Sequence, residues 1–202
     1  MVKSAHHPSR IVRLLVSCVA FATSACVVAA PRTVCLSHYA LCSHAECAVD
    51  PKDNGRALCS CIQPGPNLNV GHSTCRERDD PEQTRAAFSL YDLARIHDKP
   101  ALRAYHCTGK YRNHYARCLD AKCTPAAGKG TDASPKAAQC DCQLGRKPGD
   151  FYVMTADCGQ PPEALCSKIW AAASREELEG ERNSLVKYYA FPAGLEFCPE
   201  QR

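Results

Sequence analysis

The chain has 202 residues, of which 45% are hydrophobic and 7% aromatic, and this leaves room for one or two small domains. Of its 25 lysine and arginine residues, three precede residue 31, which leaves 22 basic residues against 21 acidic ones in the rest of the chain. This near balance excludes a one-signed field that would attract nucleic acid or an anionic membrane.

Residues 1–29 have the layout of a secretory signal peptide, with a basic start followed by an apolar stretch. The apolar stretch, residues 14–30, is too short and too rich in Ala and Ser to predict a membrane span. Small side chains at Val27 and Ala29 suit cleavage after Ala29. We therefore expect a secreted or periplasmic protein with no transmembrane helix once the signal is removed.

Two alternatives remain for this N-terminal segment: a retained anchor helix, or a lipoprotein acylated at Cys26 and lipid-anchored at the cell envelope. The cysteine count favours removal. Cys18 and Cys26 lie inside the segment, and of 16 cysteines an even number, 14, then remain. This density of cysteine is typical of an oxidising compartment and of a fold stabilised by disulfides instead of a large core.

The strongest feature of the sequence is an internal repeat of a six-cysteine module. Residues 38–47, HYALCSHAEC, match residues 114–123, HYARCLDAKC, at six positions. Each copy then reaches Ala-x-Cys-x-Cys, at residues 57–61 and 138–142, and outer cysteines flank it. The repeat predicts disulfides within the modules but not their pairing. The cysteines concerned are Cys35, Cys42, Cys47, Cys59, Cys61, Cys75, Cys107, Cys118, Cys123, Cys140, Cys142 and Cys158.

Each module is predicted to be a small hairpin-type unit. Cys59 and Cys61 alternate, so an extended segment would place both on one face of a strand. Asn54-Gly55 predicts a tight turn at a hairpin tip. Between the modules, Asp80-Pro81-Glu82-Gln83 could begin a helix, whereas the pattern of residues 88–91 alternates as a strand would.

After the second module, Ser174 and Glu177 form the pattern of a capping box, and apolar residues then recur at helical spacing. We expect a helix over about 175–190, ended by Phe191-Pro192 and packed on the second module. Cys166 and Cys198 are left over and are predicted to pair. The expected fold is thus a small disulfide-rich α+β fold with two hairpin-type modules and a C-terminal helix. The expected segments are 1–29 signal peptide, 30–78 module 1, 79–106 connecting segment, 107–160 module 2 and 161–202 C-terminal helical segment.

The repeated pattern Ala-x-Cys-x-x-Ala-x-Cys followed by Ala-x-Cys-x-Cys resembles a group of uncharacterised cysteine-rich secreted proteins of bacteria. The resemblance covers both modules and extends to residues 169–174. It implies a periplasmic or cell-surface location and no particular activity. A looser similarity is to EGF-type modules, from which the chain departs because the Gly–aromatic–Gly turn before the last cysteine is absent.

The sequence contains none of the common catalytic or cofactor-binding motifs. It has no Gly-x-Ser-x-Gly elbow, no cysteine with thiol-protease flanks and no Gly-rich phosphate loop. The cysteines and His38 could ligate a metal, but thiols in an oxidising compartment pair instead, so we predict no metal site and no cofactor. Tyr39 and Tyr115 are expected to cover the disulfides, with the neighbouring histidines at the surface.

One basic and aromatic segment is a candidate surface for an anionic ligand. Between residues 103 and 117, basic side chains alternate with Tyr and His, a combination that can hold an anionic envelope glycan by charge and stacking. The alternative is an ordinary solvated face. The residues concerned are Arg103, Lys110, Arg112 and Arg117.

Our leading hypothesis is a non-enzymatic protein of the cell envelope or the secreted fraction that binds or spaces a partner with two rigid modules. The partner would be an anionic envelope glycan or another envelope protein. The competing hypothesis is a secreted effector or enzyme inhibitor that uses an exposed loop such as Asp50 to Ala57. A third hypothesis is an enzyme whose catalytic residues come together only in the fold.

Overall fold

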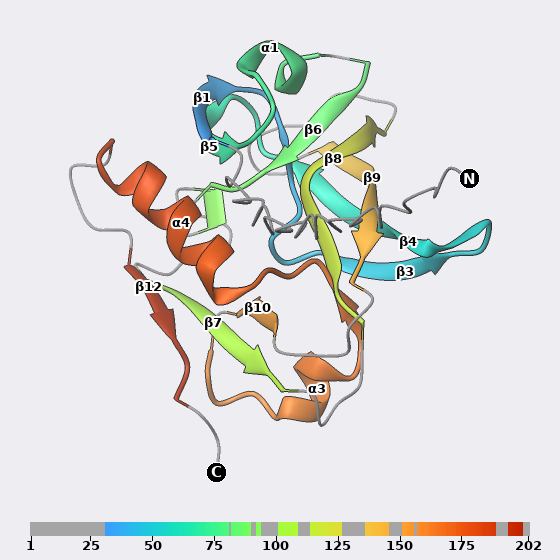
Figure 1. Cartoon of the computed structure of the whole chain (residues 1–202), viewed down its shortest axis with the longest axis vertical. Helices are drawn as coiled ribbons and strands as arrows, with labels where there is room; N and C mark the ends of the chain where they lie inside the picture. Colours follow the sequence, from blue (N-terminus) through green and yellow to red (C-terminus); the bar gives the residue numbers. More distant parts are fainter. Residues whose placement is uncertain are drawn as a thin grey trace, which may run out of the picture.

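The computed structural model describes residues 31–80, 82–89, 92–93, 101–108, 114–126, 136–145, 151–155, 157–188 and 194–199. The predicted signal peptide, with Cys26, lies outside these residues. Within them the protein is disulfide-rich, as predicted, and consists mostly of β-strands (Figure 1). The expectation of an α+β fold is therefore corrected, since only one of the described helices is longer than five residues.

The described elements fall into three sheets and three helices. In chain order they are β1 (Thr33–Ser37), β2 (Ala40–Leu41), β3 (Glu46–Asp50), β4 (Asp53–Gln63), β5 (Asn67–Gly71), α1 (Cys75–Arg78), β6 (Thr84–Ala87), β7 (Ala101–Cys107), β8 (Ala116–Pro125), β9 (Lys136–Leu144), β10 (Phe151–Thr155), α3 (Pro162–Cys166), β11 (Ile169–Trp170), α4 (Arg175–Val186) and β12 (Gly194–Phe197).

The main sheet closes on itself and joins the two modules. Its strand order is β11-β3-β4-β2-β6-β8-β9, and β9 also pairs with β4, from Arg56 opposite Gln143 to Gln63 opposite Lys136. Strands β4, β2, β6, β8 and β9 therefore form a ring. So few strands enclose little space, which favours small side chains inside. Accordingly, the buried cluster that these strands share consists of alanine and cysteine, with Leu144 as the one larger residue.

Of the two local patterns predicted in the first module, the cysteine alternation is confirmed and the turn position is corrected. Cys59 and Cys61 on β4 both lie on the buried face, as their alternation predicted. A hairpin joins β3 to β4, as predicted, but its turn lies at Pro51-Lys52, between the paired residues Asp50 and Asp53, and the predicted turn residues Asn54-Gly55 lie in β4. The modules are nevertheless not separate hairpins, because β4 of the first pairs along its length with β9 of the second.

Seven disulfides link the fourteen cysteines of the described chain, and the predicted Cys166–Cys198 pair is wrong. The smaller sheet β10-β7-β12 explains the actual pairing. β10 and β12 end opposite neighbouring residues of β7, so Cys158 and Cys198, which follow these strands, meet. Cys107, at the other end of β7, meets Cys166 at the end of α3. The disulfides are Cys35–Cys75, Cys42–Cys61, Cys47–Cys59, Cys107–Cys166, Cys118–Cys142, Cys123–Cys140 and Cys158–Cys198.

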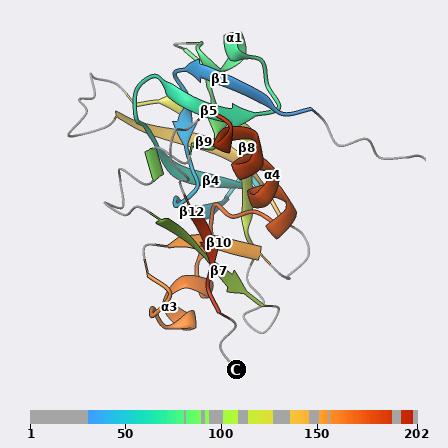
Figure 2. The same cartoon turned by 90° about the vertical axis from the view of Figure 1, so that its left-hand side faces the viewer.

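Helix α4 begins at the predicted capping box but packs differently from expectation. Its buried residues Leu178 and Leu185 join a cluster with Tyr39 and Val70 of the first module and Phe88 of the connecting segment, not chiefly the second module. In Figures 1 and 2, α4 lies beside β5 and above the small sheet that contains β12 and β7. The helix therefore packs against both the first module and the small sheet β10-β7-β12.

The segment after the first module forms a strand instead of the helix considered for it. Thr74 and Glu77 form a capping box on the short helix α1, and Asp80 Oδ1 then accepts from the backbone N–H of Glu82 at 2.9 Å. This turn leads directly into β6. Among the described residues, no helix is both long and apolar enough to cross a membrane.

Candidate ligand-binding cavity

A cavity of about 450 Å³ lies where both modules meet the C-terminal segment. Strands β4, β6, β8, β9 and β10, helix α4 and residues 171–173 contribute to its walls. Apolar side chains, including Phe88, Leu119, Met154 and Leu178, line it together with several charged groups. Apolar and polar groups contribute about equally to the lining. A concave site that combines apolar surface with placed polar groups is typical of small-molecule binding.

Two ion pairs cross the cavity lining. Arg56 on β4 places Nη2 2.6 Å from Asp141 Oδ2 on β9, and the hydrogen bond between them raises the pKa of Arg56. Arg117 on β8 pairs with Glu177 on α4. Both pairs join elements that are distant in sequence, so they fix the positions of the cavity walls relative to one another.

Glu177 has a structural role at the start of α4. Its backbone N–H donates to Ser174 Oγ at 3.2 Å, and its Oε2 accepts from the backbone N–H of Ser174 at 2.8 Å. Burial opposes ionisation of Glu177, but this N–H and Arg117 together lower its pKa. Glu177 is therefore an ionised carboxylate that is already bonded to the N–H of Ser174 and to Arg117.

Asp120 fixes a loop at the cavity edge. It has φ 62°, a left-handed conformation that is uncommon for residues other than glycine. Its carboxylate accepts from the backbone N–H groups of His72 at 2.8 Å and Ser73 at 2.7 Å. A Cβ atom at Gly71 would come within 2.8 Å of Asp120 Oδ1, so glycine is needed for this close approach.

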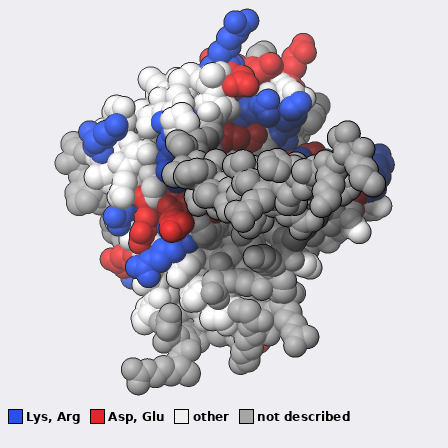
Figure 3. All heavy atoms as spheres, in the orientation of Figure 1, with Lys and Arg blue, Asp and Glu red and all other residues white. Residues whose placement is uncertain are grey.

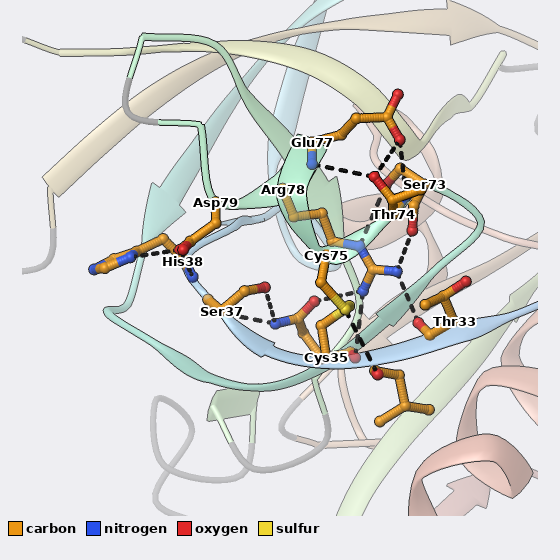
Figure 4. Close-up of a disulfide and its surroundings, with 12 residues drawn as sticks. Thr33, Cys35, Ser37, His38, Ser73, Thr74, Cys75, Glu77, Arg78 and Asp79 are labelled. Carbon is orange, nitrogen blue, oxygen red and sulfur yellow. Dashed lines mark hydrogen bonds and ion pairs between the residues drawn. A yellow bond between two sulfur atoms is a disulfide. The ribbon is translucent and has the colours of Figure 1, made fainter.

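The loop that Asp120 binds is supported from behind by Arg78, which is fully buried. Arg78 Nη2 donates to the backbone carbonyls of Thr33 and Ser73, each at 2.7 Å, and Nη1 donates to Asn69 Oδ1 at 2.6 Å. Figure 4 shows the guanidinium directed between Thr33 and Ser73. Burial lowers the pKa of Arg78, and Asp120 opposes that effect.

Glu181 differs from the other charged residues of the cavity because it is buried and yet has no bond. The residue is 3% exposed, lines the cavity, and forms no hydrogen bond or ion pair with any described residue. Burial, reinforced by the nearby carboxylate of Glu177, raises its pKa to about 8. Glu181 therefore carries its proton at neutral pH and presents a neutral carboxyl group to the cavity.

Sequence reasoning did not identify Glu181. It lies three residues after Leu178 and four before Leu185, so it occupies the buried stripe of α4, where an apolar residue is expected. An acidic residue within an apolar stripe is the signal that could have revealed it. Sequence reasoning placed Glu177 only as a helix cap, which the structure confirms, and could not place it beside a cavity.

Of the four residues of the predicted anionic-ligand strip, the structure describes two, Arg103 and Arg117, and they do not share a site. Arg103 lies on β7, where its Nε is 3.5 Å from Glu196 Oε2, and it does not line the cavity that contains Arg117. Lys110 and Arg112 lie outside the described residues. On the face shown in Figure 3, basic and acidic side chains lie close to one another instead of forming a surface of one sign.

The cysteines of the ring pack closely but offer no thiolate to a metal. Three groups of three sulfur atoms lie within 4.8 Å of one another, and all of these atoms belong to disulfides. Cys118 Sγ, for example, is 3.4 Å from Cys59 Sγ of a different disulfide. These groups are therefore the packed sulfur core of the ring.

The repeated His-Tyr pair has different surroundings in its two copies. Tyr39 is fully buried among apolar side chains outside the cystine cluster, and its hydroxyl donates to Asp92. Tyr115 stacks on Phe151 with ring centroids 5.1 Å apart. His38, beside Tyr39, is exposed, and its Nδ1 lies 2.9 Å from Asp79 Oδ1. Figure 4 shows the two side chains directed toward each other. The expectation that both tyrosines cover disulfides is thus not met at Tyr39.

Comparison of the chain with protein-family models, with curated proteins and with solved structures found no match. The cavity itself offers one buried, unbonded carboxyl group, beside apolar side chains and two ion pairs.

Proposed function

We propose that this is an exported binding protein that holds a small molecule in the cavity between its modules. The observation that carries the proposal is the cavity itself, about 450 Å³ in volume, with a buried carboxyl group that no described residue satisfies. An unsatisfied buried polar group costs free energy of folding, and a ligand that bonds to it recovers that cost.

The other acidic side chains of the cavity are already bonded to protein groups, and this favours a binding function over catalysis. Acid–base catalysis by carboxyl groups commonly uses two of them, one protonated and one free to accept a proton. In the described lining, Asp141 is paired with Arg56, Glu177 with Arg117, and Asp120 with backbone amides. Glu181 thus has no second unengaged carboxylate beside it among the described residues.

Export is part of the same proposal. Seven disulfides and the predicted signal peptide support it, as does the resemblance to cysteine-rich secreted proteins of bacteria. Oxidised cysteines and a small core also make a rigid frame, which lowers the entropy that a binding site loses when it closes on a ligand.

A cavity-blocking experiment tests the proposal. Ala121 and Ala173 line two different walls and are partly buried, so Phe at either position would fill part of the cavity. Ala48, exposed on β3, provides the control Ala48→Phe. Protein purified from the exported fraction is examined by native mass spectrometry and then screened against a fragment library.

The wild type and the Ala48→Phe control should carry a bound small molecule or bind fragments, and the two blocked variants should lose them. Bare wild-type protein, together with a library in which no binder is lost on blocking, would overturn the proposal. Folding of each variant is checked by circular dichroism and by the intact mass of the oxidised chain.

The β3–β4 hairpin supports a second candidate function, that of an enzyme inhibitor. The hairpin projects from the molecule in Figure 1, its tip residues 51–54 are exposed, and the Cys47–Cys59 disulfide fixes its base. A panel of protease and lysozyme assays tests this. Inhibition that is lost when Lys52 and Asp53 are both replaced by Gly would support it, and absence of inhibition at micromolar protein would reject it.

A further inference from the structure

We propose that the cavity binds an organic cation, with its ammonium group against Glu181 and its apolar body against the walls. This inference rests on the proposed function, because it names the chemical class of the ligand that the cavity holds.

The first step of the argument is the position of Glu181. It lies on the buried stripe of α4, next to the apolar side chain of Leu178, which also lines the cavity. With 3% of its surface exposed and no bond to a described residue, its carboxyl group has little access to water and is available to a ligand in the cavity. Such a group is stabilised most by a ligand that can form a charged hydrogen bond with it.

The second step is the sign of the surrounding charge. The carboxylates of Glu177, on the same helix, and Asp120, on β8, both disfavour the ionised form of Glu181. Arg32, whose guanidinium lies against Gly180 of α4, favours ionisation but does not outweigh burial and these two acids. Two further acids thus line the cavity close to Glu181, and a cation among them would offset the burial and the repulsion that keep Glu181 protonated.

The third step excludes an anion as the preferred ligand. Arg56 and Arg117 in the lining already have carboxylate partners. Arg85 Nη1 donates to a backbone carbonyl at 3.3 Å, and Lys122 is exposed to solvent. His72 has Nδ1 3.2 Å from a backbone carbonyl. An anion would therefore have to break an existing bond or remain at the exposed edge, whereas a cation finds an unoccupied acid inside.

Binding has a defined proton balance. An alkylammonium enters with its charge, Glu181 releases its proton to solvent, and the carboxylate then accepts a hydrogen bond from the ammonium. Because the pKa of free Glu181 is about 8, about one proton should be released per ligand at pH 7. Below that pKa, affinity should fall about tenfold for each unit by which the pH is lowered, since ligand and proton compete for one carboxylate.

The test uses the full-length oxidised protein and three probes of matched shape: 4-phenylbutylamine, 4-phenylbutanol and 4-phenylbutanoate. Titration calorimetry is carried out between pH 6 and pH 8.5 in buffers of different ionisation enthalpy, because these reveal proton release. A primary alkylammonium remains charged over this range, since its pKa is near that of lysine, about 10. The amine should bind at least about tenfold more tightly than the alcohol, and the carboxylate most weakly.

The variant Glu181→Gln tests the contribution of the ionisable carboxyl group, because it keeps the size of the side chain. It should weaken amine binding about tenfold, abolish its proton release and its pH dependence, and leave the alcohol unaffected. The matched control is Glu176→Gln, the same change at an exposed position of α4, which should bind as the wild type does.

The outcomes separate this inference from the proposed function. If Ala121→Phe removes binding, yet the alcohol binds as well as the amine or no proton is released, the cation is rejected and the binding cavity stands. If no probe binds, the inference also fails, and the cavity-blocking screen then decides separately on the proposed function.

Discussion

Cys59 on β4 lies directly opposite Cys140 on β9, and the two are the same position of the two modules. On either side the register exchanges equivalent positions: Cys61 faces Ala138, and Ala57 faces Cys142. A local two-fold axis therefore passes between Cys59 and Cys140. The duplicated strand pairs with its own copy, as the halves of a symmetric dimer do, and this pairing closes the ring of strands.

The symmetry ends at the outer cysteines, which leads to a first prediction. Cys35 pairs with Cys75 in the first module, whereas the equivalent Cys107 and Cys158 each pair outside the second module. Proteolysis without reductant, followed by mass spectrometry, should yield peptides joined through Cys107–Cys166 and Cys158–Cys198. A peptide that joins Cys166 to Cys198 would contradict the structure.

The two outer disulfides that close loops of equal length form a matched pair for stability. Cys35–Cys75 and Cys158–Cys198 both have a sequence separation of 40. Replacing either pair by serine should lower the free energy of unfolding by about 4 kcal/mol, since the restriction of the unfolded chain is equal. Urea denaturation measures both. A much smaller effect for Cys158→Ser with Cys198→Ser would show that the C-terminal strand contributes little to folding.

Local features of this fold were predictable from the sequence. The Ser174–Glu177 capping box depends on residues close together in the chain and forms as expected. A hairpin also forms near Asn54-Gly55, but its turn lies at Pro51-Lys52, and Asn54-Gly55 lies inside β4. The alternation of Cys59 and Cys61 likewise depends only on strand geometry. In each case the interacting groups lie within a few residues of one another, so spacing alone contains the information.

Features that depend on distant contacts were not predictable. The pairing of Cys166 follows from the position of β7 beside α3, which no local pattern encodes. The cavity exists only because β4, β8 and α4 meet. Glu181 is buried beside it only because the packing of α4 directs this face of the helix toward the cavity. A residue's burial and its charged neighbours are properties of the assembled chain, and they determine its chemistry.

Buried Arg78 should be among the most sensitive positions of the fold. Its guanidinium donates in different directions to Thr33, Asn69 and Ser73, and the compact ammonium of lysine cannot reach all three. Arg78→Lys should lower the free energy of unfolding by about 3 kcal/mol, because buried acceptors lose their donors. Arg76→Lys, on the exposed side of α1, is the control and should change it by less than about 0.5 kcal/mol. Equal effects in urea denaturation would show that the network contributes no stability.

The left-handed backbone of Asp120 predicts an unusual order of variants. Asp120→Ala and Asp120→Gly both remove the acceptor of the His72 and Ser73 amides, which should cost about 1–3 kcal/mol. Glycine adopts φ 62° without strain, whereas alanine does not. The glycine variant should therefore be more stable than the alanine variant by about 1 kcal/mol, the reverse of the order in ordinary strands. Thermal unfolding compares them, and a more stable alanine variant would show that this conformation is not required.

Glu181 should make the protein less stable as the pH rises. Below pH 4.5, its ordinary pKa, the carboxyl group is protonated in both the folded and the unfolded chain. Above it, the unfolded chain ionises while the folded chain keeps the proton up to about pH 8, so the unfolded state is increasingly favoured over this interval.

Glu181→Gln removes this difference between the two states. At pH 7 it should therefore raise the free energy of unfolding by about 3 kcal/mol, with little effect at pH 4. Urea denaturation at several pH values measures the change, with Glu176→Gln as the exposed control on the same helix. A gain in the Glu181 variant that is equal at pH 4 and pH 7 would show that the buried carboxyl does not keep its proton. Such a result would also remove the proton exchange on which cation binding in the cavity depends.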